Sequence, residues 1–162
     1  MTVVNFLYYL TFASSLGSGL LAGVFFTFSA FVMTSLSRLP AEQSISAMQS
    51  INSTILQSLF MLVFMGTTIL SVVLGVASFF KSGTHSAIYV IIGSLFIFVG
   101  VFLVTAIFNV PLNNSLAAVS PGAAEGAQVW SEYIAGWVPW NHVRTISSIA
   151  ALISFMIALR KW

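Results

Sequence analysis

Long apolar stretches, separated by a few short polar segments, dominate the pattern along this chain. A helix needs roughly 20 mostly apolar residues to cross a hydrocarbon core about 30 Å thick. Four stretches meet that length, and the predicted spans are residues 6–33, 59–79, 88–108 and 143–159. Because the apolar runs are continuous, they lack the alternation expected of barrel strands. The pattern therefore predicts an all-α, integral membrane four-helix bundle that forms one domain over residues 1–162.

Two connections between the predicted spans are longer than simple turns. Residues 37–58 contain Pro40 and Glu42 at a typical helix start, followed by apolar residues at helical spacing. Residues 109–141 begin with Asn-Val-Pro-Leu-Asn-Asn, break at a Pro-Gly pair, and resume as a stretch that suits a helix lying in the membrane interface. An even number of spans places both connections at the same end, where we expect them to form a cap over the bundle.

The charged residues indicate an orientation. Both termini and the turn at residues 82–84 share one end of the predicted bundle. The basic residues are distributed three to two, with Lys81, Arg160 and Lys161 at that end and Arg38 and Arg144 at the other. Because basic residues favour the cytoplasmic side, we expect both termini in the cytoplasm of a plasma or inner membrane and both long connections on the non-cytoplasmic side. The first apolar run is too long for a cleaved signal peptide.

Composition excludes whole classes of function. The chain is 59% hydrophobic and only 5% charged, whereas about a quarter of the residues are charged in a soluble domain. It has no Cys, which excludes disulfides and Cys-ligated metal centres. A net charge of +2 carried by scattered residues forms no phosphate-binding surface, so we expect no nucleic acid partner. The expected partners are the lipid bilayer and a hydrophobic small molecule.

Polar residues with useful chemistry gather at the two ends of the second connection. They are Asn109, Asn113, Trp130, Trp137, Trp140, Asn141, His142 and Arg144. Polar and ionisable residues at a membrane helix are costly, which makes them candidates for function. Trp rings offer stacking surfaces, Asn amides orient a phenol or carbonyl, His takes a proton near neutral pH, and Arg stabilises an anion. The cluster therefore suits a flat, hydrophobic aromatic ligand.

The same residues also allow a structural interpretation. The Trp residues suit an aromatic belt, Asn residues cap helix ends, and Arg144 can extend to lipid phosphates or pair with Glu42 or Glu132. Small residues at every fourth position from Ser15 to Thr27 suit close packing inside the bundle, with a homo-oligomer as the less common use.

Metal and nucleotide cofactors are not expected. Only His142, Glu42 and Glu132 could be gathered as metal ligands, and they lack the helical spacing of known sites. No Gly-rich nucleotide fingerprint is present in the sequence.

Several short motifs are shared with a known family. They are Ser18-Gly19-Leu-Leu-Ala-Gly23-Val-Phe-Phe, Arg38-Leu-Pro, Ala47-Met-Gln-Ser-Ile-Asn52, Phe102-Leu-Val-Thr-Ala, Asn109-Val-Pro-Leu-Asn113 and Trp140-Asn-His-Val-Arg144. On these motifs the chain resembles the anthrone oxygenase family of small four-helix membrane proteins. The Asn-x-Pro-Leu-Asn and Trp-Asn-x-x-Arg elements are the most specific, and the glycines of the first span are the least specific.

The resemblance implies an oxygenase that converts an anthrone into an anthraquinone with molecular oxygen, without flavin or haem. A deprotonated anthrone can itself reduce oxygen, so the protein need only supply a base, anion stabilisation and a dry pocket. On this hypothesis the catalytic residues are His142 as the base and Arg144, with Asn109 or Asn113, as the anion-binding group. The ligand-contacting residues are Trp130, Trp137, Trp140 and Asn141. Another phenol, a quinone precursor or a lipid is an alternative substrate.

Two other functions remain open from the sequence. One is a binding or transport protein for small hydrophobic molecules, and the other is a structural membrane scaffold whose cap contacts a partner.

Overall fold

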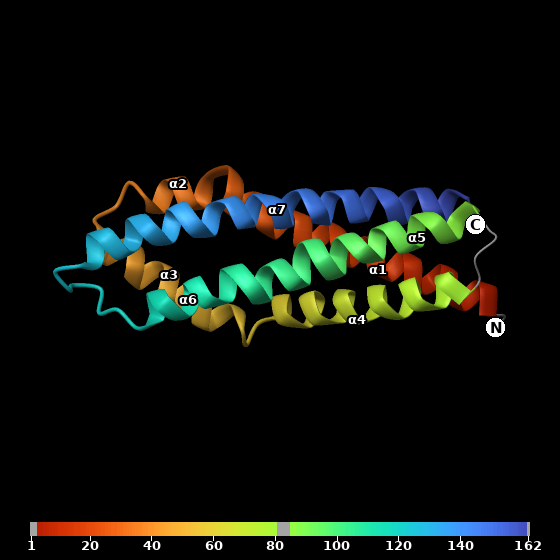
Figure 1. Cartoon of the computed structure of the whole chain (residues 1–162), viewed down its shortest axis with the longest axis horizontal. Helices are drawn as coiled ribbons and strands as arrows, with labels where there is room; N and C mark the ends of the chain where they lie inside the picture. Colours follow the sequence, from red (N-terminus) through yellow and green to blue (C-terminus); the bar gives the residue numbers. More distant parts are fainter. Residues whose placement is uncertain (1–2, 81–84, 162) are drawn as a thin grey trace.

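The computed structural model describes residues 3–80 and 85–161 of the chain. Within those residues all regular structure is helical. The described residues form four long helical rods. The rods lie side by side, with both chain ends at one end of the bundle (Figure 1). Each rod is long and apolar enough to cross a membrane. The chain is therefore a multi-pass helical membrane protein, and the predicted all-α membrane bundle is confirmed. The predicted turn at residues 82–84 lies outside the described residues.

Each rod is built from one or more consecutive helical segments. The first rod contains α1 (Val3–Thr27), the π-helical η1 (Phe28–Val32) and α2 (Met33–Leu36), and α3 (Ala41–Ile55) connects it to the second rod, α4 (Leu59–Phe80). The third rod contains α5 (His85–Leu95), the π-helical η2 (Phe96–Leu103) and η3 (Thr105–Asn109), and α6 (Val110–Ala117). The fourth rod is α7 (Gly126–Arg160).

The fourth rod departs furthest from the sequence prediction. α7 begins at Gly126, so the segment expected to lie separately in the interface is continuous with the predicted fourth span. Pro139 sits inside this helix, where it removes one backbone hydrogen bond, a loss that membrane helices tolerate. The third rod likewise extends to Ala117. The second connection therefore shrinks from the predicted 109–141 to residues 118–125.

The first connection forms the predicted helix, α3, at the end of the bundle opposite the termini (Figure 1). α3 packs on the ends of the first, third and fourth rods through a buried apolar cluster made of Met33, Ile45, Met48, Leu116, Trp130, Tyr133 and Trp137. The side-chain amide of Gln49 donates hydrogen bonds of 2.9 Å to the carbonyl oxygens of Leu116 and Val119. The two connections thus meet at one end of the bundle, as the even number of predicted spans led us to expect.

An apolar core and close helix contacts hold the other half of the bundle together. Its fully buried side chains include Leu21, Leu74, Val90, Ile97 and Phe155. A Cβ atom at Gly17 would collide with the side chain of Thr67, so α1 and α4 approach closely there. Gly19 makes only ordinary contact with Leu152, and Gly23 faces open space. Among these three glycines of α1, the close contact is made by Gly17, which lies outside the predicted every-fourth-residue pattern.

The rods differ in length, and this difference sets the level of α3 relative to the bilayer. At 1.5 Å per residue, the 22 residues of α4 give about 33 Å, close to the thickness of a hydrocarbon core. The 35 residues of α7 give about 52 Å. The rods end together near the termini (Figure 1), so the extra length lies at the α3 end. We infer that α3 and α6 lie at the membrane surface and that the start of α4 marks the edge of the hydrocarbon core.

Candidate functional site

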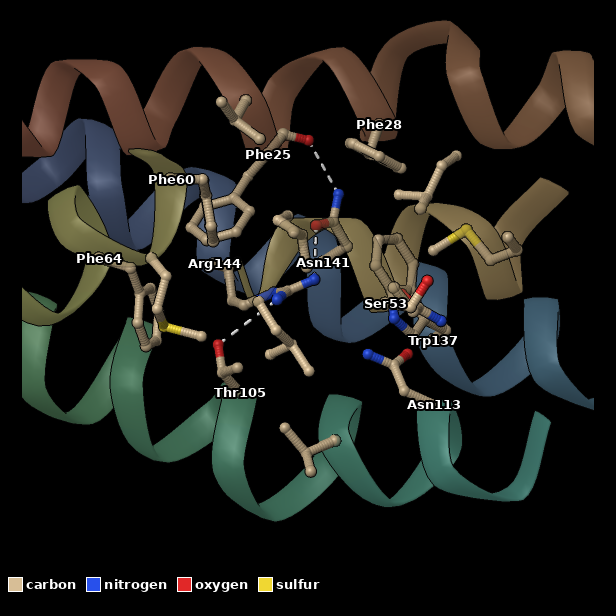
Figure 2. A pocket seen from close by; sticks show the side chains of 18 of the residues that line it. Phe25, Phe28, Ser53, Phe60, Phe64, Thr105, Asn113, Trp137, Asn141 and Arg144 are labelled. Atoms are coloured by element: carbon tan, nitrogen blue, oxygen red, sulfur yellow. Dashed lines mark hydrogen bonds between the residues drawn. The ribbon is translucent and has the colours of Figure 1, made fainter. Parts of the chain in front are cut away.

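A cavity of about 440 Å³ lies where α3 meets the four rods. Its volume is within the range of small-molecule binding sites. All four rods and α3 contribute to the wall, through side chains that include Phe25, Phe28, Met48, Asn52, Phe60, Phe64, Phe102, Thr105, Asn113, Trp137, Asn141 and Arg144. Figure 2 shows the cavity from close by, with Arg144 near its centre.

Aromatic rings cover much of this wall. Phe60 packs edge-on against Phe25 and stacks on Phe64, with ring centroids 5.9 Å apart in both pairs. On the other side of Arg144, the rings of Phe28 and Trp137 are 5.7 Å apart. These are ordinary distances for aromatic pairs, so the rings support one another in fixed orientations. The result is a set of flat apolar surfaces that matches a flat aromatic ligand.

Arg144 carries the only formal charge among the described residues that line the cavity. Its side chain is 6% exposed. Nη2 donates a 2.8 Å hydrogen bond to Asn141 Oδ1, and Nη1 donates a longer one of 3.4 Å to Thr105 Oγ1. The guanidinium carbon lies 4.5 Å from the Phe25 ring centroid and 5.0 Å from that of Trp137. Cation–π contacts therefore hold the charge between two aromatic faces.

No carboxylate in the described part of the chain forms an ion pair with Arg144. Glu132 is exposed and accepts a 2.9 Å hydrogen bond from Gln128. Glu42 is exposed and lies beside Gly122 in the second connection. Neither carboxylate that the sequence offered as a partner fills that role. The cavity therefore holds a positive charge with no described carboxylate partner. Such an unpaired buried charge lowers the stability of the folded protein.

Three buried N–H donors on the cavity wall have no hydrogen-bond acceptor: Arg144 Nε, Trp137 Nε1 and Asn52 Nδ2. Asn52 lies near the Tyr133 hydroxyl, but its Nδ2 makes no hydrogen bond of ordinary geometry there. The Tyr133 hydroxyl instead donates to Asn113 Oδ1 at 2.9 Å. The Nε atoms of arginine and tryptophan can only donate. These orphaned groups match a ligand that brings acceptor oxygens into the cavity.

Asn141 anchors Arg144. Its side chain is fully buried, and its Nδ2 donates to the Phe25 carbonyl oxygen at 2.8 Å and to Ser29 Oγ at 2.7 Å. Its Oδ1 accepts from Arg144, so both N–H groups and the oxygen are engaged by the protein. Phe25 and Ser29 flank the start of the π-helical η1, a type of segment that often occurs at functional sites. Asn141 thus ties α7 to the first rod and fixes the guanidinium.

His142 and Asn109 lie outside the cavity wall. His142 is exposed, and its Nδ1 is 2.9 Å from Ser29 Oγ. A ligand in the cavity would not contact the imidazole. Asn109 is fully buried and donates from Nδ2 to the Trp137 carbonyl oxygen at 3.3 Å. Asn109 therefore joins the third rod to α7.

The predicted tryptophans also separate. Trp137 lines the cavity, whereas Trp130 stacks on Tyr133 in the buried cluster beneath α3. Trp140 stacks on Phe108 with ring centroids 3.6 Å apart, away from the cavity wall. The structure thus brings four of the predicted residues together at the cavity, namely Asn113, Trp137, Asn141 and Arg144. It places the other predicted residues elsewhere, namely Asn109, Trp130, Trp140 and His142.

Sequence reasoning about single residues missed much of the wall. Phe60 and Phe64 lie in an apolar run with no distinguishing feature. Phe25, Asn52 and Thr105 lie inside the motifs shared with the family. Those motifs were the one sequence feature that could have identified them as site residues. Among the described residues, no three His, Asp or Glu side chains come together to hold a metal ion.

One comparison with known proteins identifies a family. The family model for anthrone oxygenase matches residues 60–154, more than half of the chain. The matched stretch runs from the start of α4 through the third rod and most of α7, so it includes Asn113, Trp137 and Arg144. Comparisons with the curated proteins and with the solved structures find no match.

Proposed function

The chain belongs to the anthrone oxygenase family, and we propose that it oxidises a flat, hydrophobic phenolic or anthrone-like molecule bound in the cavity. The observation that carries the proposal is Arg144, a buried cation without a carboxylate partner among aromatic walls. Negative charge develops on the substrate oxygen when such a molecule is activated toward O₂. Arg144 is placed to stabilise that charge.

The reaction balances with O₂ as the only co-reactant. An anthrone loses a proton to give an enolate, which passes electrons to O₂ so that a C–O bond forms at the central carbon. The second C–H proton then leaves as the O–O bond breaks, which gives the ketone and one water. The carbon loses four electrons and O₂ gains them. The protein therefore has to favour the enolate and exclude water while the oxygen reacts.

Different residues of the cavity would stabilise the enolate, whereas the proton would pass to water. Arg144 favours the deprotonated substrate by direct attraction, because a nearby opposite charge stabilises an ionised group. The amide nitrogen of Asn113 is an available donor, since its oxygen is engaged by Tyr133. The described lining residues include no His, Lys, Asp or Glu, so we propose that the proton leaves to water at the α3 end of the cavity, where Ser53 and Asn114 are exposed. His142 as the base would have to act through Ser29 and Asn141 instead.

Oxygen consumption by the purified protein with a simple hydroxyanthrone tests the proposal. We expect wild-type uptake well above spontaneous autoxidation, with one O₂ consumed for each quinone formed. Replacing Arg144 by Met keeps the length of the side chain and removes the charge. Because loss of one charge-stabilising donor typically costs a factor of about 10²–10³, we expect a decrease in kcat of that order in Arg144→Met.

Arg38→Met is the matched control, because Arg38 is exposed and outside the cavity wall. It should keep wild-type turnover. Wild-type uptake no faster than autoxidation contradicts the proposal, as does full turnover in a folded Arg144→Met variant. Tight binding of the anthrone without any oxygen uptake favours a binding protein instead.

A further inference from the structure

The cavity is closed on one side and open on the other. Its lining residues on α7 (Trp137, Asn141 and Arg144) are all buried, and those on the first rod are buried or half-buried. The exposed lining residues, which we call the rim, belong only to the α3–α4 segment and the third rod. They are Ser53, Leu56, Met65, Ala106, Val110, Asn114 and Ala117. The cavity therefore opens sideways between these two segments.

The surface around the rim is apolar. Beside it on α4, Leu59 is 80% exposed and Leu62 is 70% exposed, and beside it on the third rod Ile107 is 58% exposed. The rim itself carries no charged side chain. An apolar surface of this extent on a membrane helix faces lipid.

The rim crosses the edge of the hydrocarbon core. Met65 lies six residues, less than two helical turns, after the start of α4 and therefore inside the inferred hydrocarbon core. The two polar rim residues, Ser53 and Asn114, lie toward the α3 end, where the rods extend past the hydrocarbon core at the level inferred above from the length of α4. A flat amphiphile dissolved at this level of the bilayer faces the opening with its apolar body in the lipid and its polar edge toward the surface.

We propose that the ligand enters and leaves the cavity sideways from the bilayer, through the rim, and that it is a lipid-dissolved flat aromatic molecule whose oxygen reaches Arg144. The nature of the ligand rests on the proposed function, whereas the route rests on the rim alone. Entry from the bilayer keeps an apolar substrate out of water on its way to the site. O₂, which dissolves readily in hydrocarbon, is supplied through the same opening.

Cysteine labelling tests the route, because the chain has no native Cys and a single introduced thiol is a unique target. Val110→Cys and Met65→Cys place a thiol on opposite sides of the rim. Ile107→Cys and Leu62→Cys are matched controls, exposed on the same two rods but not lining the cavity. Each variant, reconstituted in liposomes, is labelled with benzyl methanethiosulfonate, whose bulky group is removed again by dithiothreitol.

The probe is a stable hydroxyanthraquinone delivered in lipid vesicles, and its binding is followed in a stopped-flow instrument by quenching of tryptophan fluorescence. A blocked route slows entry and exit alike. For the labelled rim variants we therefore expect association and dissociation rates lower by about tenfold, with Kd changed by less than about threefold. Dithiothreitol should restore both rates, and the labelled controls should behave as wild type.

The possible results separate the route from the proposed function. Unchanged rates in both labelled rim variants overturn lateral entry, as does a changed Kd with an unchanged association rate, which would indicate contact with the bound ligand. Slowed binding with no oxygen uptake by the wild type retains the route and removes the oxygenase function. No binding of the probe by the wild type overturns both.

Discussion

Arg144 is a cation that the protein holds in an apolar cavity at a cost to its own stability. Burial removes the water around the guanidinium, and no described carboxylate offsets the resulting loss of hydration free energy. The contacts with Asn141, Phe25 and Trp137 offset only part of that cost. A purely structural arginine would be expected to pair with a carboxylate. The orphaned Nε of Arg144 instead points to a ligand that completes the site.

Stability measurements distinguish these two roles of Arg144. We predict that Arg144→Met leaves the free energy of unfolding unchanged or raises it by about 1–2 kcal/mol, because apolar replacement of buried charged groups is often neutral or stabilising. Thermal unfolding in detergent, followed by circular dichroism, measures this. A Tm several degrees below that of the wild type would show that Arg144 holds the bundle together, as the scaffold interpretation requires.

Asn141 and His142 are adjacent in sequence, yet only Asn141 lines the cavity. We predict that Asn141→Leu lowers the rate of oxygen uptake by at least about tenfold, since Arg144 then loses the oxygen that positions it. We predict that His142→Ala retains turnover within about threefold, because water at the rim can accept the proton. Side-by-side rates for the two purified variants decide the matter. Loss of activity in a folded His142→Ala variant would instead support the sequence-based assignment of His142 as the base.

Helical spacing explains why three of the predicted site residues reach the cavity together. Trp137, Asn141 and Arg144 are four and three residues apart, so they share one face of α7. His142 lies on another face, whereas Trp140 shares this spacing and yet stacks on Phe108 instead of lining the cavity. A continuous helix could therefore have set His142 apart from the site, but the place of Trp140 depends on how the rods pack. The Phe residues of the other rods were beyond sequence reasoning, because their positions depend on how the rods pack.

At the scale of elements, apolar length was sufficient to predict the spans but not the continuity of α7. From the sequence, the second connection is predicted to end at residue 141 and the fourth span to begin at residue 143, which places Asn141 to Arg144 at the edge of a span. In the structure the same residues lie inside a long helix that extends past the hydrocarbon core. The polarity of Asn141 and Arg144 therefore reflects the cavity that they line rather than the end of an element.

The glycines of α1 provide a test of how the rods pack. We predict that Gly17→Ala lowers the free energy of unfolding by about 1–3 kcal/mol, because the added methyl group overpacks the contact with Thr67. Gly23→Ala, on the same helix with open space around it, should be neutral or slightly stabilising, since alanine favours helix. Thermal unfolding of both variants in one detergent checks the pair. Equal effects would mean that Gly17 does not set the approach of α1 and α4.

At the scale of the whole molecule, the structure changes the count of basic residues that bears on orientation. Arg144 is buried within α7, so it cannot act as a loop charge at the α3 end. Arg38 remains there alone, whereas Arg160, Lys161 and, from the sequence, Lys81 belong to the end with the termini. The bias toward cytoplasmic termini is therefore larger than the sequence alone indicated.

Reporter fusions in a bacterial host test that orientation. We predict that green fluorescent protein fused after Trp162 fluoresces and that alkaline phosphatase at the same place is inactive, because phosphatase folds only outside the cytoplasm. Phosphatase inserted in the connection at residues 118–125 should be active. Replacing Lys81, Arg160 and Lys161 together by Gln removes the bias and should give a mixed orientation, whereas Arg38→Gln should not. Active phosphatase at the C-terminus of the wild type would reverse the assignment and place α3 and the polar end of the rim on the cytoplasmic face.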